Sequence, residues 1–391
     1  MRNLMVTALV AAAAAVAPAA RAADNTQGVT PREIKIGTYT DLSGVTAMWG
    51  VNNSNSWRMV FEDANKEGGI NGRRIDYILE DNQYQVPRSV QAENLLLNEY
   101  GVFIEVANGG TPMNNATMPM QFRKNVPNVF PLTSARSMYE PFNRLKFALG
   151  ASYYDQVRSG VKYFVQSRHE TKVCVATQDT DFGRDVLQGA QDELKALNLP
   201  VVSVTKHPPT ATDFSADVAK LHDAGCDLLV VGGIVRDTNQ IIGAVRKSGW
   251  KVDMMGQAAS YDNAVAGVPG GVTEGFYSMT PMLYVQPNDP DPKVHAFVVA
   301  YQARYGKDPN FAAEIGYTGA QITVLALQRA GKDLTTNGFI HGMESIKDYR
   351  DIFGSPPFSF APDKHLGSNQ SFLCVVKDGK WAPVLKQPIG Y

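Results

Sequence analysis

The feature that most constrains the fold is a repeated alternation of short apolar strands with amphipathic helices. The segment Glu33-Ile34-Lys35-Ile36-Gly37 alternates polar and apolar residues, which predicts a strand. Next, Trp57, Val60, Phe61 and Ala64 recur at helical spacing, which predicts a helix ending at Gly68-Gly69. An Asn71-Gly72 turn then leads to a strand over 74–80. Units of about 25 to 30 residues that alternate in this way are typical of βαβ crossovers and parallel sheets.

The same alternation continues, pauses around 147–155 and restarts. We therefore predict two consecutive doubly wound α/β lobes of about 120 residues each. In the first lobe, helices open at Pro87 and Pro112, and strands cover 101–106 and 128–131. The second lobe has expected strands at 172–177, 200–205, 227–232 and 251–256, and expected helices at 183–197, 214–224 and 239–248.

The last hundred residues complicate this division. Helices are expected over about 293–305, 312–330 and 340–346, followed by strand-like pieces at 358–360 and 372–376. We assign these elements to the lobes already begun, so the chain crosses between the lobes more than once. Multiple crossovers form a hinge, and a hinged cleft is a binding device.

Composition and charge narrow the function classes. Apolar residues make up 44% of the 391 and charged residues 19%, as in an ordinary globular protein. The 37 Lys and Arg nearly balance the 38 Asp and Glu, and no basic stripe with interleaved aromatics occurs. The sequence therefore predicts no nucleic-acid partner.

The N-terminus predicts export. A short positive start (Met1-Arg2-Asn3) precedes an apolar run from Leu4 to Val16, and Ala20-Arg21-Ala22 fits the small-x-small pattern of a signal peptidase site. The alternative is an uncleaved anchor, but the run is shorter than the roughly 20 residues that span a bilayer. We predict a signal peptide over 1–22, cleaved after about Ala22, and a soluble periplasmic protein.

Catalytic and metal motifs are not found. The sequence lacks G-x-G-x-x-G after the first strand, a P-loop and G-x-S-x-G, and its six His are scattered. Cys174, Cys226 and Cys374 lie in or beside apolar runs without zinc spacing, so we expect buried, unreactive thiols with at least one unpaired. The segment 179–185 resembles a calcium loop but fits a helix N-cap better. No enzyme activity, cofactor or metal is predicted.

The loops after the strands are the candidate binding site. In open parallel sheets, ligands bind beyond the carboxyl ends of the strands. These ends fall at 41–50, 108–112 and 131–135 in the first lobe, and at 178–183, 232–236 and 257–262 in the second. The segment Gly109-Gly110-Thr111-Pro112 is the most informative, because free amides at a helix start attract an anion and glycines let a ligand approach. A plain tight turn before a helix is the alternative for this loop.

Several motifs occur in an order that resembles one family. They are Ile34-Lys35-Ile36-Gly37 with Asp41-Leu42-Ser43-Gly44, Glu67-Gly68-Gly69-Ile70-Asn71-Gly72-Arg73, residues 179–183, Asp213-Phe214-Ser215, residues 229–233 and Glu274-Gly275-Phe276. The series, from about residue 32 to the C-terminus, resembles type I periplasmic solute-binding proteins of the leucine/isoleucine/valine-binding class, which serve ABC importers. The resemblance implies two Rossmann-like lobes joined by three hinge strands that close over one ligand. We expect lobe 1 to comprise 32–151 plus about 283–356, and lobe 2 to comprise 152–282 plus about 357–391.

The resemblance also implies roles for individual residues. Backbone amides and hydroxyls at Gly110, Thr111, Leu132 and Ser134 correspond to the family's carboxylate site. Trp49 and Phe182 resemble its ligand-capping aromatics, whereas a further family aromatic is replaced by Ile234. Ala258 falls about where the acid that binds the ligand ammonium belongs. Asn82-Gln83 and Asn108 stand where the family has a first-lobe disulfide.

The missing acid predicts the ligand class. A buried ammonium without a carboxylate partner costs several kcal/mol. We therefore predict a ligand with a carboxylate and no α-ammonium group. Because Trp49, Phe182 and Tyr261 suit a flat ligand, we expect an aromatic acid of the benzoate or cinnamate type. Arg236 is either a polar contact or a solvated residue, and Tyr153 and Tyr154 are either hinge packing or cleft wall. Asp262 would replace the lost acid if the loop register shifts, so branched-chain amino acids or amides remain the alternative. The expected partners are this ligand and an ABC permease, with the protein as a monomer.

Overall fold

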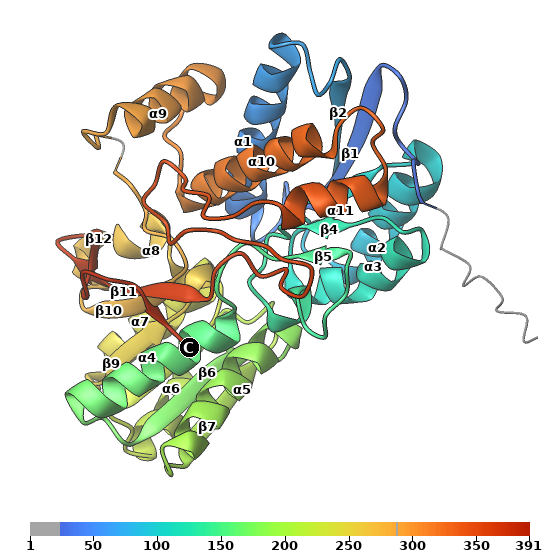
Figure 1. The fold of residues 1–391 in the computed structure, drawn as a ribbon. Coiled ribbons are helices and arrows are strands. Elements are labelled where there is room, and N and C mark those ends of the chain that lie inside the picture. The colour runs from blue at the N-terminus through green and yellow to red at the C-terminus, as the bar shows by residue number, and fades with distance from the viewer. Residues whose placement is uncertain (1–23, 287) are drawn as a thin grey trace, which may run out of the picture.

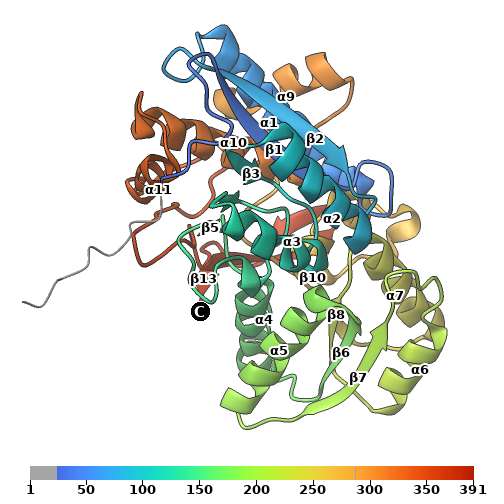
Figure 2. The same cartoon turned by 90° about the vertical axis from the view of Figure 1, so that its right-hand side faces the viewer.

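The chain forms two α/β lobes, which lie one above the other in Figures 1 and 2. The computed structural model describes residues 24–286 and 288–391. The predicted signal peptide therefore lies outside the described residues. Within these ranges, no helix combines the length and the hydrophobicity needed to cross a bilayer.

Lobe 1 is built on a parallel five-stranded sheet of order β2-β1-β3-β4-β5, with helices on both faces. Its strands are β1 (Glu33–Thr40), β2 (Arg74–Asp81), β3 (Ile104–Val106), β4 (Asn128–Val129) and β5 (Lys146–Phe147). Its helices are α1 (Ala47–Lys66), α2 (Val86–Asn94), a π-helix (Leu95–Tyr100), α3 (Thr111–Arg123), α9 (Pro292–Tyr305), α10 (Phe311–Ala330) and α11 (Thr336–Glu344). Apolar side chains of α1, α10 and α11 pack on one face, and those of α2 and α3 pack on the other.

Lobe 2 has a mixed sheet of order β12-β11-β10-β9-β8-β6-β7. The strands are β6 (Val173–Gln178), β7 (Val201–His207), β8 (Leu228–Gly232), β9 (Asp253–Gly256), β10 (Phe276–Thr280), β11 (Gln370–Lys377) and β12 (Lys380–Pro383), and β13 (Ile389–Gly390) pairs with β11. The helices are α4 (Tyr153–Arg168), α5 (Asp181–Ala196), α6 (Ser215–Asp223), α7 (Val235–Ser248) and α8 (Asn263–Ala266). Helices α4 and α5 cover one face of the sheet, and α6 and α7 cover the other.

The chain crosses between the lobes three times: after β5, after β10 and after α11. The crossovers lie side by side, since Ala148 of the first forms a parallel bridge with Leu366 of the third. A Cβ added to Gly150 would lie only 2.7 Å from Pro281 Cβ of the second crossover. The prediction of two doubly wound lobes with repeated crossovers is confirmed.

The structure differs from the prediction in one helix that was not expected and in one expected strand. Helix α4 occupies the region where the alternation pauses, and it begins at Ser152, whose hydroxyl accepts a hydrogen bond from the Asp155 amide at 3.1 Å. The expected strand at 358–360 is absent from the described elements, because only Phe358 pairs, through a single bridge to Tyr349.

The cysteine prediction is corrected in part. Cys174 and Cys226 form a disulfide, with their Cα atoms 5.9 Å apart, whereas Cys374 is free and buried as expected. Cys174 lies in β6 and Cys226 lies just before β8, and these strands are hydrogen-bonded neighbours. The order of the strands in the sheet brings the two sulfurs together, and the spacing of the cysteines in the sequence does not reveal that order.

Candidate ligand-binding site

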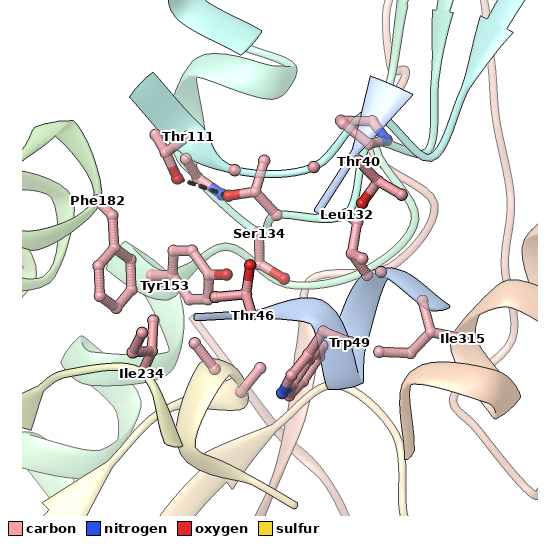
Figure 3. A pocket seen from close by; sticks show the side chains of 18 of the residues that line it. Thr40, Thr46, Trp49, Thr111, Leu132, Ser134, Tyr153, Phe182, Ile234 and Ile315 are labelled. Carbon is pink, nitrogen blue, oxygen red and sulfur yellow. Dashed lines mark hydrogen bonds between the residues drawn. The ribbon is translucent and has the colours of Figure 1, made fainter. Parts of the chain in front are cut away.

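A cavity of about 300 Å³ lies between the two lobes, at the carboxyl ends of their parallel strands. Lobe 1 contributes loops after β1, β3 and β4, and lobe 2 contributes the starts of α4, α5 and α7 and the loop after β9. Figure 3 shows side chains from both lobes converging on the same space. The volume is at the small end of the range for ligand pockets, about 300–1,000 Å³.

The lobe 1 wall carries hydrogen-bonding groups. The Thr111 and Thr133 hydroxyls are bonded to each other at 2.6 Å, and Ser134 lies beside them (Figure 3). The Thr40 hydroxyl is buried and, among the described residues, has no hydrogen-bond partner. In the described part of the chain, no protein acceptor pairs with the amides of Thr111 and Ser134. These groups offer donors to an anionic or acceptor group of a ligand.

Gly110 gives the start of this wall a backbone conformation that suits glycine. It precedes α3 and has a φ of +89°, a conformation that L side chains rarely adopt. A Cβ at this position would lie 2.7 Å from Met113 Sδ and 3.1 Å from a ring carbon of Tyr84. The position therefore favours glycine for its conformation, whereas Met113 would have to shift to admit a Cβ.

The other walls are apolar. Trp49, at the start of α1, packs edge-on against Phe311 with ring centroids 6.0 Å apart. On the opposite side, Tyr153 packs edge-on against Phe182 at 5.0 Å. Further apolar contacts come from Leu132, Ile234, Ala258, Met282 and Ile315.

Arg236 is the one charged residue among the described residues that line the cavity. Its Nη2 donates to Asp237 Oδ1 at 2.9 Å and also to the Pro209 carbonyl. Burial alone would raise the pKa of Asp237, but the nearby His207 ring, with Nε2 3.5 Å from Asp237 Oδ2, and hydrogen bonds from Gln178 and Arg236 hold that pKa below its ordinary value. The guanidinium is therefore neutralised by a buried carboxylate of its own lobe.

Nine of the twelve predicted site residues line the cavity. They are Trp49, Gly110, Thr111, Leu132, Ser134, Phe182, Ile234, Arg236 and Ala258. Ala258 lies at the bend after β9, where its amide donates to Gln156 Oε1 at 2.8 Å. The loops after the strands thus line one cavity, as the positions of the strand ends predict.

Tyr154 is not among the lining residues; its neighbour Tyr153 is. Both belong to the first turn of α4, where successive side chains point about 100° apart. The Tyr154 hydroxyl donates to Asp192 Oδ2 at 2.8 Å, and the Arg136 guanidinium lies 4.1 Å from the centre of its ring. The question left open for this pair is resolved: Tyr153 belongs to the cleft wall, and Tyr154 packs outside the cavity.

Tyr261 and Asp262 also lie outside the lining. Tyr261 is buried in the core, where its ring packs against Trp381 at 4.6 Å and its oxygen accepts the Tyr284 amide at 3.2 Å. Asp262 caps α8 by accepting the Ala264 amide at 2.9 Å, and it accepts Asn310 Nδ2 at 3.2 Å. Burial raises the pKa of Asp262 to about 6. The loop register therefore does not bring Asp262 to the position of the lost acid.

Several lining residues were not predicted. Thr40 and Thr46 lie at the end of β1 and in the loop after it, so the strand-end argument could have included them. Met282 and Ile315 come from the second crossover and from α10, far along the chain. Only the return of the chain to lobe 1 brings them to the cleft, and no local pattern marks them.

The polar positions noted in the sequence have structural roles. Asn82 donates to Ser89 Oγ at 3.0 Å, and Asn108 donates to Glu105 Oε2 at 2.7 Å, so hydrogen bonds occupy the positions where the resembling family has cysteines. Thr180 caps α5 by accepting the Gly183 amide at 3.4 Å, in agreement with an N-cap in 179–185. Across residues 24–286 and 288–391, no group of three His, Cys, Asp or Glu side chains is arranged to hold a metal.

The chain is similar to known binding proteins. A family model described as "Periplasmic binding protein" matches residues 33–380. The leucine-specific-binding protein of Salmonella typhimurium is 24% identical over 324 residues, which cover 80% of this chain and 85% of that protein. The Leu/Ile/Val-binding protein of Escherichia coli is 22% identical over 254 residues, or 65% of this chain and 69% of that protein. These relatives are solute-binding proteins, not enzymes.

Solved structures share the fold. A branched-chain amino acid ABC transporter structure from Thermus thermophilus with bound valine has a TM-score of 0.82 at 18% identity, covering 92% of this chain and 97% of that one. A fatty acid ABC transporter substrate-binding protein from Thermomonospora curvata has a TM-score of 0.80 at 23% identity, covering 93% and 94%. At these identities the likeness concerns the fold.

Proposed function

Because the chain belongs to the periplasmic binding protein family, which delivers small-molecule ligands to ABC transporter permeases, we propose that its ligand is a small carboxylate without an α-ammonium group. An aromatic acid of the benzoate or cinnamate type fits the cavity first. The ligand carboxylate would accept hydrogen bonds from the Thr111 and Ser134 amides and the Ser134 hydroxyl. The ring would lie between Trp49 and Phe182, whose side chains face the cavity from opposite lobes.

One observation carries this proposal: none of the described residues that line the cavity is Asp or Glu. An α-ammonium group enclosed here would lack a carboxylate partner, which typically costs several kcal/mol. The one basic lining residue, Arg236, is already paired with Asp237. The cavity therefore favours a single anionic group joined to an apolar body.

The alternative ligand is a branched-chain amino acid or an amide. It is favoured by the names of the relatives, which are leucine-specific and Leu/Ile/Val-binding proteins. Among the solved structures with this fold, one has bound valine and another is named for fatty acids. Asp262, the acid that would support the alternative, is engaged with Ala264 and Asn310.

We further propose that the lobes close over the ligand by movement at the three crossovers. In this proposal, lobe 1 comprises 32–151 plus about 283–356, and lobe 2 comprises 152–282 plus about 357–391.

We also propose that residues 1–22 direct export and are removed after about Ala22, and that the mature protein acts as a monomer in the periplasm. Mass spectrometry of the secreted protein tests the cleavage position, and light scattering tests the monomer.

A thermal-shift screen of the purified protein tests the ligand class. Benzoate and cinnamate should raise the melting temperature at millimolar concentration, whereas leucine, valine and simple amides should not. Stabilisation by leucine or valine, with none by the ammonium-free acids, would reject the proposal in favour of the alternative.

A further inference from the structure

Two carboxylic acids lie together beneath the loop that forms the anion-binding wall of the cavity. Glu93 of α2 and Glu105 of β3 are both completely buried. Gln121 of α3 bridges them, since its Nε2 lies 3.2 Å from Glu93 Oε2 and 2.9 Å from Glu105 Oε2. One oxygen of each carboxyl group has no hydrogen-bond partner among the described residues.

The pair has no cationic partner. In the described part of the chain, no cationic group acts on Glu93 or Glu105, and the other titratable group that faces them is Tyr39 of β1. The Tyr39 hydroxyl is bonded to Thr117 of α3 at 2.6 Å. Two like charges in a buried site without a cation cannot both be ionised at neutral pH. Burial, above all, raises the pKa of both carboxyl groups above the ordinary value, and that of Glu93 further than that of Glu105.

Glu105 is connected to the cavity through Asn108. Its Oε2 accepts Asn108 Nδ2 at 2.7 Å, while the Asn108 side-chain oxygen accepts the Tyr39 amide at 3.1 Å. The Asn108 carbonyl accepts the Leu132 amide at 2.9 Å and Asn114 Nδ2 at 2.8 Å. Gly109, Gly110 and Leu132, which line the cavity, are therefore held by the residue that Glu105 orients.

We propose that Glu105 is a positioning residue for the Gly109–Gly110 loop. We further propose that Glu93 stays protonated and that Glu105 takes up a proton when an anion binds at this loop. The second half of this proposal depends on the proposed function, because it requires an anionic ligand. A negative charge bound at the loop disfavours ionisation of the nearby pair, so one proton from solvent binds the Glu105 carboxylate and forms the neutral acid. The affinity for a carboxylate should accordingly fall as the pH rises through neutrality.

The positioning half can be tested without a ligand. In the mature protein, the backbone amide NMR signals of Gly109, Gly110 and Thr111 should shift between pH 5.5 and 8.5, because the raised pKa of Glu105 places its ionisation above the ordinary range of a carboxyl group. Glu105→Gln should abolish this titration, whereas Glu99→Gln, the same change at an exposed position, should leave it intact. If Glu105→Gln does not fold, the wild-type titration decides alone. Loop amides that do not respond between pH 5.5 and 8.5 would overturn the proposal.

The anion half is tested by calorimetry with benzoate, which is ionised throughout this range. Between pH 6.5 and 8.5, benzoate affinity should fall by about fivefold or more, and the binding heat should depend on the ionisation heat of the buffer, as linked proton uptake requires. In Glu105→Gln, both effects should disappear. Wild-type affinity that is independent of pH would refute proton coupling while leaving the proposed ligand class standing. Absence of benzoate binding at both pH values would reject the ligand class and the anion half together, whereas the NMR titration would still decide the positioning half.

Discussion

Replacing Ala258 with glutamate should change the ligand preference of the cavity. Ala258 lies on the lobe 2 wall, opposite the hydroxyls and amides of lobe 1, and its side chain is almost fully buried. A carboxylate introduced here would repel a bound carboxylate and would offer a partner to an ammonium group.

The size of the effect follows from the cavity volume. A sphere of about 300 Å³ is about 8 Å across, and two unit charges separated by about 8 Å repel by about 2 kcal/mol at an effective dielectric constant near 20. Since about 1.4 kcal/mol corresponds to a factor of ten, benzoate should bind Ala258→Glu about 30-fold more weakly than the matched control Ala258→Gln. The control has nearly the same shape without the charge, so steric effects cancel in the comparison.

Isothermal titration calorimetry with benzoate and leucine on both variants measures the effect. Leucine should bind Ala258→Glu more tightly than Ala258→Gln, the reverse of the order for benzoate. The reasoning would be refuted by equal benzoate affinities in the two variants, or by a wild-type protein that binds leucine tightly and shows no affinity for ammonium-free acids.

Three further predictions concern the site and the stability of the fold. Ser134→Ala should weaken benzoate binding by about 1–3 kcal/mol if the hydroxyl meets the carboxylate. The control Ser137→Ala changes a residue outside the cavity lining and should leave the affinity unchanged. An unchanged benzoate affinity of Ser134→Ala would remove Ser134 from the site. Replacing both Cys174 and Cys226 by alanine should lower the free energy of unfolding by about 2–4 kcal/mol, because the disulfide closes a loop with a sequence separation of 52. Urea unfolding measures this change, and an unchanged unfolding midpoint would contradict the prediction. Burial raises the pKa of Asp262 to about 6, so the folded state keeps this carboxyl group protonated to a higher pH than the unfolded state does. As the pH rises from about 4 to above 6, the free energy of unfolding should therefore fall by up to about 3 kcal/mol. Asp262→Asn should flatten this part of the dependence of melting temperature on pH, and parallel curves for the two proteins would count against it.

Most of the fold could be predicted from the period of the apolar residues. The helix expected over 183–197 is α5 (Asp181–Ala196), and the strand expected over 172–177 is β6 (Val173–Gln178). Helix α4 was not predicted, although Val157, Val161 and Phe164 recur at helical spacing on its buried face and Ser152 caps its start. Without that helix, the sequence could not distinguish Tyr153, which faces the cavity, from Tyr154, which does not.

The site was predictable where a single strand end forms it. The loops holding Gly110, Ser134 and Ala258 follow directly from strand positions, and all three residues line the cavity. Ile315 could not be found in this way, because it reaches the cleft only through the packing of α10 on lobe 1. The pairing of Cys174 with Cys226 likewise depends on which strands are neighbours, a property of the folded sheet.

The position of β11 has a consequence for how the protein folds as it is synthesised. This strand lies between β10 and β12 in the second sheet, although β10 ends at Thr280 and β11 begins only at Gln370. Until the ribosome has made that last segment, β10 presents an unpaired edge and the sheet stays incomplete. The nascent chain would thus remain unable to finish lobe 2 until almost the whole polypeptide has been synthesised.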